Sequence, residues 1–351
     1  MAEIYGTFGP SCCSQNVLEA MLREGLTGMR LNLSHASLLD SLPFIDNYKK
    51  ACEKVKKPME LMIDLHGPEQ RIGQLAKELT LSPGDTLVLS GPDNSKAPGT
   101  LVVPAAILTA CEPGDRLIIH DGAVELEAVE RLNPAGSEKN PQRFCCRVLR
   151  GDTISGQQSI QIEGKEVYGD VVTQADLENL NLAKEMGVTS VMQPFVRGAE
   201  DLRTLRSVLE KRKLKLRIFA KIESLTGLAN LETIIPFADV IVIARGDLGN
   251  AMPLWELPRA QKKIARSCQE AGKPFLTVTQ LLASMTQNAS PTRAEVSDIF
   301  NAILDGASAV MVTGETAVGR YPVEVIRYLA KTVETAEDYA ADLSQGTYRT
   351  E

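Results

Sequence analysis

Short apolar runs alternate with helix-length amphipathic segments along most of the chain, and this alternation limits the fold more than any other feature. It is typical of βαβ units that build a parallel sheet. Eight strand–helix pairs predict an α/β fold, a closed TIM (β/α)8 barrel. The expected strands lie at 3–8, 27–34, 59–65, 190–196, 216–223, 239–245, 274–279 and 308–313. The expected helices lie at 14–25, 36–55, 174–186, 198–212, 225–235, 259–271, 292–306 and 322–340.

One connection, between the third strand and its helix, is far longer than the usual few residues. We predict that residues 72–170 form an inserted all-β, barrel-like domain after strand 3, and that residues 1–71 and 171–351 form the catalytic barrel. Because the insertion leaves the carboxyl end of a barrel strand, where the sites of such barrels lie, we expect it to act as a lid. Its strand-like runs lie at 86–90, 116–119, 144–149 and 159–162, separated by turn signals at 83–85, 98–99, 113–115, 133–134 and 140–141.

Composition excludes several classes of protein. The chain has 38 Lys and Arg against 45 Asp and Glu, a net charge of −7, which is the wrong sign for binding nucleic acid or anionic membranes. Its 7 cysteines show no C-x-x-C spacing and no Cys/His clusters, which argues against a disulfide framework and structural zinc. The N-terminus has no signal-like start and no apolar run is long, so we expect a soluble, cytoplasmic protein.

Polar residues end several of the expected strands, where the mouth of a barrel would lie. Side chains at i, i+2 and i+4 of a strand share a face, so Arg30, Asn32 and Ser34 point one way. A parallel barrel strand is buried on both faces, and polar side chains there need partners. An exposed antiparallel strand with an ordinary polar face is the alternative interpretation.

The fifth and sixth strands repeat this pattern. Lys221 and Glu223 point to one side of the fifth strand, and the sixth ends at Arg245-Gly246-Asp247. Two carboxylates that leave positions open for substrate oxygens suit Mg²⁺. A buried Lys–Glu ion pair and a turn aspartate would explain the same residues without a metal.

The remaining strand ends add a carboxylate and hydroxyls. The third strand ends at Asp64, the seventh at Thr279 and the eighth at Thr313-Gly314-Glu315-Thr316, although single residues of these types are usually helix caps. The assembled set contains Arg, Lys, Asn, Ser, Thr and carboxylates but no histidine, which suits phosphoryl transfer by positioning and charge neutralisation. No P-loop and no dinucleotide-binding glycine motif are present.

Short stretches dispersed along the chain carry a resemblance. They are Thr7–Ser11, Arg30–His35, Asp64–Arg71, Lys221–Glu223, Ala244–Gly249, Gly272–Pro274, Thr279–Gln280, Pro291–Glu295 and Gly314–Ala317. In this order and at these separations the chain resembles the pyruvate kinase family over nearly its whole length, and only the inserted domain matches weakly. The resemblance implies transfer of the phosphoryl group of phosphoenolpyruvate to ADP, giving pyruvate and ATP.

The resemblance also implies site residues and cofactors. Glu223 and Asp247 would hold Mg²⁺ (or Mn²⁺), whereas K⁺ would be held by Asn32, Ser34, Asp64 and the carbonyl of Leu65. Catalysis would fall to Arg30 and Lys221, which face the phosphoryl group, and to Thr279 near the carbon that takes up a proton. The residues implied for substrate binding are Arg30, Lys221, Gly246, Asp247 and Thr279. Those implied for nucleotide binding are Thr7, Pro10, Asn32, His35 and Arg71.

A further implication concerns assembly, because Arg293 falls where family members brace a neighbouring subunit. The resemblance therefore implies a homodimer or a higher homo-oligomer through the barrel. The sequence ends after the last expected barrel helix, so we expect no carboxyl-terminal regulatory domain.

The sequence departs from the family pattern in places that bear on nucleotide and K⁺ use. Leu65 and His66 replace a threonine and a lysine, and Pro194 replaces a serine on the fourth strand. In the insertion, His120 replaces an aspartate, Gln158 replaces a lysine that meets nucleotide phosphate, and Glu163 adds a negative charge. We therefore expect reduced or altered nucleotide use. A non-catalytic sensor of phosphoenolpyruvate and Mg²⁺, and a Mg²⁺-dependent lyase or decarboxylase acting on a pyruvate-like enolate, remain alternatives.

Overall fold

The computed structural model describes residues 1–92, 100–132 and 143–345. The chain forms two compact units, residues 1–67 with 171–351 and residues 68–170, which we call unit 1 and unit 2. Each unit has its own hydrophobic core and is described by itself. The turns predicted at 98–99, 133–134 and 140–141 lie outside the described residues.

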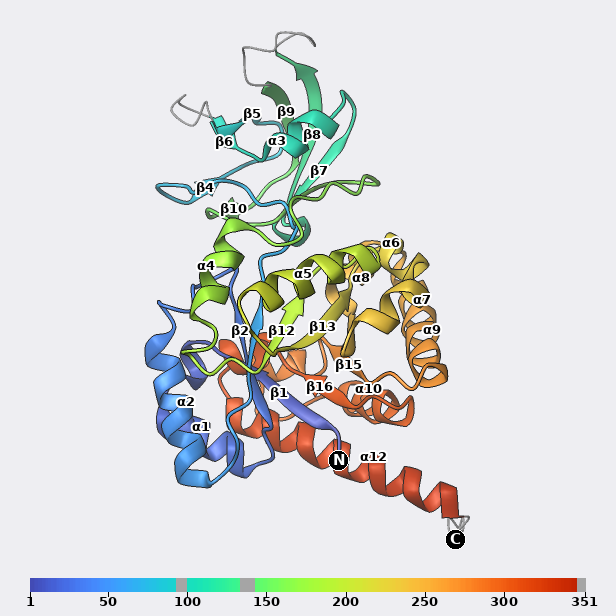
Figure 1. Ribbon diagram of the computed structural model, residues 1–351. Coiled ribbons are helices and arrows are strands. Elements are labelled where there is room, and N and C mark those ends of the chain that lie inside the picture. Colours follow the sequence, from blue (N-terminus) through green and yellow to red (C-terminus); the bar gives the residue numbers. More distant parts are fainter. Residues whose placement is uncertain (93–99, 133–142, 346–351) are drawn as a thin grey trace. The chain divides into compact units, whose positions relative to one another are not determined.

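Unit 1 is a closed barrel of eight parallel strands, as the sequence predicts (Figure 1). All eight strands lie within the apolar runs that predict them. The strands lie around the barrel in the order in which they occur along the chain, β1-β2-β3-β12-β13-β14-β15-β16. The strands are β1 (Glu3–Thr7), β2 (Gly28–Asn32), β3 (Leu61–Asp64), β12 (Ser190–Gln193), β13 (Arg217–Ile222), β14 (Val240–Ala244), β15 (Phe275–Val278) and β16 (Ala309–Met311).

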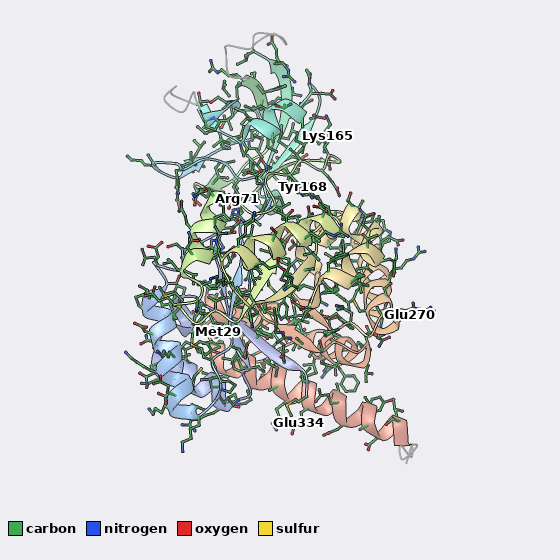
Figure 2. The ribbon with its side chains drawn as sticks, in the orientation of Figure 1. Met29, Arg71, Lys165, Tyr168, Glu270 and Glu334 are labelled. Atoms are coloured by element: carbon green, nitrogen blue, oxygen red, sulfur yellow. The ribbon has the colours of Figure 1, made fainter. Side chains whose placement is uncertain are left out.

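Alternation along these strands separates two apolar layers. Every residue of β14 is buried, because one face of the strand points into the barrel and the other packs against helices. Inside the barrel, the rings of Tyr5 and Phe219 meet edge to face with their centroids 6.1 Å apart. Met29 is fully buried in the outer layer, whereas Glu270 and Glu334 lie exposed on the helices of unit 1 (Figure 2).

The predicted helices are present, with differences at their ends. The helix predicted over 36–55 begins only at Leu42, because Ser37 and Asp40 bond to each other at 2.6 Å and form a turn. The helix predicted over 225–235 is broken at Asn230. The helices are α1 (Gln15–Arg23), α2 (Leu42–Val55), α4 (Gln174–Leu182), α5 (Ala199–Lys211), α6 (Leu225–Ala229), α7 (Leu231–Ile234), α9 (Leu257–Glu270), α10 (Arg293–Leu304) and α12 (Pro322–Gln345).

Short helices that the sequence does not predict occupy the connections around the barrel. They are too short to show a periodic apolar pattern. Within the described part of the chain, no helix combines the length and the apolar character needed to cross a bilayer. The short helices are η1 (Pro10–Cys12), η4 (Ile235–Phe237), α8 (Arg245–Asn250), η5 (Leu254–Glu256), η6 (Ala283–Thr286) and α11 (Gly314–Ala317).

Asp176 fixes the start of α4 to the end of β3. Its buried side chain accepts hydrogen bonds from the backbone N–H groups of His66, Gly67 and Thr173 at 2.7, 3.1 and 2.9 Å. It also accepts one from the Thr173 hydroxyl at 2.7 Å. The Thr173 hydroxyl in turn accepts from Asp176 N at 3.1 Å, and this bond together with the one from Thr173 N forms a capping box. Burial by itself would raise the pKa of Asp176, but the hydrogen bonds from His66 and Thr173 outweigh burial and lower it.

Replacing Asp176 with asparagine should lower the free energy of unfolding by about 2–3 kcal/mol at pH 7, because an amide cannot accept all of these hydrogen bonds. Since the pKa of Asp176 is lower in the folded state, its contribution is complete above the unfolded value of 3.8 and is lost as the pH falls through the folded value. Urea unfolding at pH 7 and at a pH below 3.8 measures both effects. Glu178→Gln, an exposed change on the same helix, is the control, and an equal effect of the two variants would contradict the assignment.

Unit 2 contains a six-stranded sheet in the order β11-β7-β8-β9-β5-β6 and a two-stranded sheet of β4 and β10. Neighbouring strands are antiparallel except β5 and β6, which are parallel. The strands are β4 (Leu79–Thr80), β5 (Thr86–Ser90), β6 (Thr100–Val102), β7 (Arg116–Ile119), β8 (Val124–Arg131), β9 (Arg143–Arg150), β10 (Thr153–Ile154) and β11 (Ile160–Ile162).

Unit 2 differs from the expected all-β, barrel-like domain. It includes helix α3 (Ala105–Ala110), and the strands of its described residues form two sheets rather than one closed barrel. Alanine favours a helix, and Ile107 and Leu108 of α3 are buried in the core of the unit. Residues 68–71, which we expected with the barrel, belong to unit 2, where Arg71 forms an isolated antiparallel β-bridge with Ser159.

Candidate active site

Four of the predicted site residues form one ion-pair network in unit 1. Arg30 Nε and Nη2 donate to Asp64 Oδ2 at 2.9 and 2.6 Å. Lys221 Nζ lies 3.3 Å from the same oxygen and 2.9 Å from Glu223 Oε1. Asp64 and Glu223 are each only 2% exposed. The structure therefore brings residues from β2, β3 and the end of β13 into direct contact.

Strand register explains this contact. Arg30 lies opposite Met62 and Asn32 opposite Asp64 in the parallel pair of β2 and β3. Lys221 and Glu223 are two positions apart at the end of β13, so both side chains point to the same side. Because all the strands are parallel, their carboxyl ends meet at one rim of the barrel.

Burial and neighbouring charges set the protonation of this network. Burial would raise the pKa of Asp64, but Lys221 and Arg30 outweigh it and lower the pKa, so Asp64 stays ionised. Burial would lower the pKa of Lys221, but Asp64 and Glu223 raise it above its usual value. Burial raises the pKa of Glu223 to about 8, with Lys221 opposing the rise and Asp247 adding to it.

Together with Asp247, the network carries an excess of negative charge when all of these groups are ionised. Arg30 and Lys221 are the two cations, and Asp64, Glu223 and Asp247 are the three carboxylates. Asp247 lies on α8, and its charge acts on both Lys221 and Glu223. A buried carboxylate whose pKa is raised is stabilised in its ionised form by an added cation. The rim is therefore electrostatically suited to bind a metal ion.

Thr279 lies next to Gly246 and has an unusual backbone. A Cβ placed on Gly246 would lie 3.5 Å from Thr279 Cγ2 and 3.8 Å from its Oγ1. Thr279 Oγ1 is buried and has no hydrogen-bond partner within the described residues. The φ angle of Thr279 is 77°, a left-handed conformation that costs on the order of 1–3 kcal/mol for a β-branched residue.

Known proteins share both the sequence and the fold. A family model described as pyruvate kinase, barrel domain, matches residues 1–326. The chain belongs to the pyruvate kinase family. A pyruvate kinase of Thermococcus litoralis is 34% identical over 349 residues, covering 99% of this chain and 72% of the relative. A solved pyruvate kinase structure from Cryptosporidium parvum has a TM-score of 0.82 and 27% identity, covering 100% of this chain and 73% of that chain.

Some pyruvate kinases are much longer than this chain. A relative from Staphylococcus epidermidis is 33% identical over 350 residues, covering 98% of this chain but only 59% of the relative. The chain thus spans less than two thirds of such pyruvate kinases.

The side chains present fit the two cations that the pyruvate kinase family implies. For Mg²⁺, Glu223 and Asp247 supply two carboxylates. Within the described ranges, no group of three His, Cys, Asp or Glu residues could hold a metal. A Mg²⁺ ion at Glu223 and Asp247 would therefore take its other ligands from substrate and water. For K⁺, Asp64 Oδ1 is buried without a hydrogen-bond partner in that part of the chain, and Asn32 lies opposite Asp64 in the sheet.

The residues that pyruvate kinases imply for nucleotide binding belong to both units. Thr7 is buried, donates to Val312 O at 3.0 Å and accepts from Arg30 Nη1 at 3.4 Å, so it joins the network. Pro10 and His35 are exposed in unit 1. Arg71 lies in unit 2, where it bonds to Gln157 O at 2.9 Å and pairs with Glu69 (Figure 2). Ser34, which pyruvate kinases imply for K⁺, is half-buried, and its N–H donates to Asn32 Oδ1 at 3.2 Å.

Sequence reasoning gave no role to several residues that the structure places around Thr279. Arg245 stands in the same motif as Gly246 and Asp247, and Glu315 stands in another matching stretch, but neither was assigned any chemistry. Asp298 of α10, which pairs with Arg245 at 2.6 Å, was not singled out at all. A charged residue within a strand-end motif was the available signal for Arg245, whereas nothing in the sequence marked Asp298.

Proposed function

We propose that the chain transfers the phosphoryl group of phosphoenolpyruvate to ADP, giving pyruvate and ATP. The main support is that Arg30 and Lys221 are both anchored to the buried Asp64 at the barrel rim, beside Glu223. Phosphoenolpyruvate carries a phosphate and a carboxylate, and a ligand with two anionic groups requires cations fixed in place. Membership of the pyruvate kinase family supports the same reaction.

In this proposal an oxygen of the terminal ADP phosphate bonds to phosphorus, the bond from phosphorus to the enol oxygen breaks, and the enolate keeps the electron pair. Arg30 and Lys221 hold the phosphoryl oxygens as this charge moves. Asp64 stays ionised and fixes both cations beforehand, so little reorganisation is needed during the reaction. Thr279 Oγ1 would hold the proton for the enolate carbon, which completes pyruvate.

Two cations complete the proposed site. Glu223 and Asp247 would hold Mg²⁺ or Mn²⁺, and Asn32, Ser34, Asp64 and the Leu65 carbonyl would hold K⁺. When bound, these ions supply neutralising charge for the phosphoryl and enolate oxygens. Leu65 offers only its backbone here, since its side chain is buried in the outer core, and we therefore propose a weaker affinity for K⁺ than in relatives with a hydroxyl at this position.

Pyruvate formation from phosphoenolpyruvate, with and without ADP, tests the proposal. The mixture contains Mg²⁺ and K⁺, and pyruvate is measured by a coupled reduction to lactate. We expect pyruvate and ATP in equal amounts, with a strict requirement for ADP. Pyruvate without nucleotide would instead indicate a lyase, and metal-dependent binding of phosphoenolpyruvate without turnover would indicate a sensor.

Nucleotide use should improve when the cation missing from unit 2 is restored. Gln158 is half-buried, and its Oε1 accepts a hydrogen bond from Ser155 N at 3.2 Å. We expect Gln158→Lys to lower the KM for ADP about fivefold, the effect of roughly one favourable unit charge near a phosphate in water, and to leave the KM for phosphoenolpyruvate unchanged. Initial rates at varied ADP measure this.

Gln161→Lys is the matched control, because Gln161 is exposed on β11 between the buried Ile160 and Ile162. An equal fall in the ADP KM for both variants would show a general charge effect and contradict the specific role of position 158.

A further inference from the structure

Two consecutive residues that follow β15 have a backbone that only glycine adopts easily. The φ angles of Thr279 and Gln280 are 77° and 53°, both in the left-handed region. Strain of this kind persists only where the surrounding structure holds it. The contacts that hold this backbone are therefore part of what places the Thr279 hydroxyl.

Arg245 provides the most direct of these contacts. Its Nη2 donates to the carbonyl oxygen of Thr279 at 2.6 Å, and its Nη1 donates to Asp298 Oδ2 at 2.6 Å. The Arg245 side chain is 10% exposed. Because a guanidinium is planar and donates in fixed directions, these two bonds fix the carbonyl of Thr279 relative to α10.

A second contact fixes the far end of the same turn. Glu315 is buried; its Oε1 accepts from Leu282 N at 3.3 Å and its Oε2 accepts from Thr313 N at 2.7 Å. The turn from 279 to 282 is thus held at its start by Arg245 and at its end by Glu315. Only the Arg245 contact is made to the strained residue itself.

We infer that Arg245 is a positioning residue, which holds the Thr279 backbone in its left-handed conformation so that Oγ1 stays buried beside Gly246. This inference rests on the proposed function, in which Thr279 serves the proton uptake by the enolate carbon. Arg245 also precedes Gly246 and Asp247 at the start of α8. Arg245 therefore stands in the same motif as Asp247 and also bonds to the backbone of Thr279, the neighbour of Gly246.

The role predicts a specific kinetic pattern. Arg245 touches a backbone carbonyl and a carboxylate, so its loss should reduce turnover without weakening substrate binding. We expect Arg245→Gln to lower kcat about 10- to 100-fold and to change the KM for phosphoenolpyruvate by less than about threefold. Arg245→Lys should recover only part of kcat, because one ammonium group cannot reproduce two bonds in fixed directions.

A double-mutant cycle separates positioning from general stabilisation. If Arg245 acts through the Thr279 hydroxyl, Arg245→Gln should cost much less when Thr279→Val is already present, and the double variant should resemble Thr279→Val alone. If the effects of the two changes on kcat multiply in the double variant, the inference is overturned. Arg206→Gln, which breaks a more exposed Arg–Asp pair with Asp239 at 3.0 Å elsewhere on unit 1, should leave kcat unchanged.

Amide hydrogen exchange provides a readout that does not depend on activity. We expect Arg245→Gln to speed exchange at residues 280–282 by about 10-fold or more, with little change in β14 or α10. Unchanged exchange at 280–282 would overturn the inference even if the enzyme were active. A wild-type chain that forms no pyruvate would refute the proposed function, and the exchange result would still decide whether Arg245 holds the turn.

Asp298→Asn keeps the inference testable if Arg245→Gln fails to fold. This change leaves the guanidinium in place and weakens only its anchor. We expect a smaller fall in kcat, about 3- to 10-fold, together with faster exchange at 280–282. If a folded Asp298→Asn protein shows neither the fall in kcat nor the faster exchange, the inference is overturned.

Discussion

We expect the replacement of Lys221 with methionine to lower kcat for pyruvate formation by about 10³-fold, because the buried ammonium group is one of the two cations fixed beside Asp64. Methionine has a similar length but no charge, so the variant removes the electrostatic contribution with little change in volume. The effect should appear in kcat more than in the KM for ADP, since Lys221 faces the phosphoryl group that is transferred. Initial rates from the coupled pyruvate assay measure it.

Stability must be measured for the same variant. Removing Lys221 leaves the buried, ionised Asp64 without one of its two cations, and breaking such a buried pair typically costs about 3–5 kcal/mol. Rates are therefore taken on protein shown to be folded by circular dichroism. Lys331→Met, which breaks an exposed pair with Glu334 on α12, is the matched control. A folded Lys221→Met protein with near-normal kcat would contradict the proposed site.

Replacing Glu223 with glutamine should abolish stabilisation by Mg²⁺ and lower turnover at least as strongly, because the variant loses one of the two proposed metal carboxylates. We expect MgCl₂ to raise the Tm of the wild-type chain at pH 8 and to leave the Tm of Glu223→Gln nearly unchanged. Thermal unfolding with and without MgCl₂ measures this. An equal rise in both proteins would remove Glu223 from the metal site.

The same variant should change how stability depends on pH when no metal is added. The pKa of Glu223 is raised from 4.5 to about 8 in the folded state, so between these values the folded chain holds a proton that the unfolded chain has released. Stability from this group is therefore complete below pH 4.5 and is lost as the pH rises through about 8. Glutamine resembles the protonated form and should not show this loss.

Urea unfolding at pH 5 and pH 8.5 provides the comparison. We expect Glu223→Gln to be more stable than wild type by several kcal/mol at pH 8.5 and close to it at pH 5, since each pKa unit corresponds to about 1.4 kcal/mol. Glu334→Gln, an exposed change on α12, controls for the loss of one surface charge. If the free energies of unfolding of wild type and Glu223→Gln change in parallel with pH, Glu223 does not titrate in this range.

The barrel could be predicted from the sequence because the pattern that indicates a strand is local to that strand. A run such as Val240–Ala244 is apolar at every position, and a strand with this composition must be covered on both faces. Side chains two positions apart on a strand lie on the same face, so the sequence also predicted that Lys221 and Glu223 lie on one side of β13. The direct contacts from Arg30 and Lys221 to Asp64 followed once eight parallel strands closed into a barrel.

Short helices could not be predicted, because the apolar pattern that indicates a helix needs several turns to appear. Helix α8 and helix α3 have six residues each, fewer than two turns, so they show no apolar period. The late start of α2 at Leu42 depends on a side-chain hydrogen bond between Ser37 and Asp40, which competes with the helix. In unit 2, strand-like runs predicted β5, β7, β9 and β11, but not the order in which they pair.

The sequence by itself determined which residues alternate, which strands are buried on both faces and which polar side chains reach the barrel rim. Only the tertiary structure decided that Arg245 binds the carbonyl of a residue 34 positions away and a carboxylate 53 positions away. The physical reason is that periodicity is a property of one segment. A left-handed turn at two non-glycine residues, by contrast, exists only because distant side chains hold it.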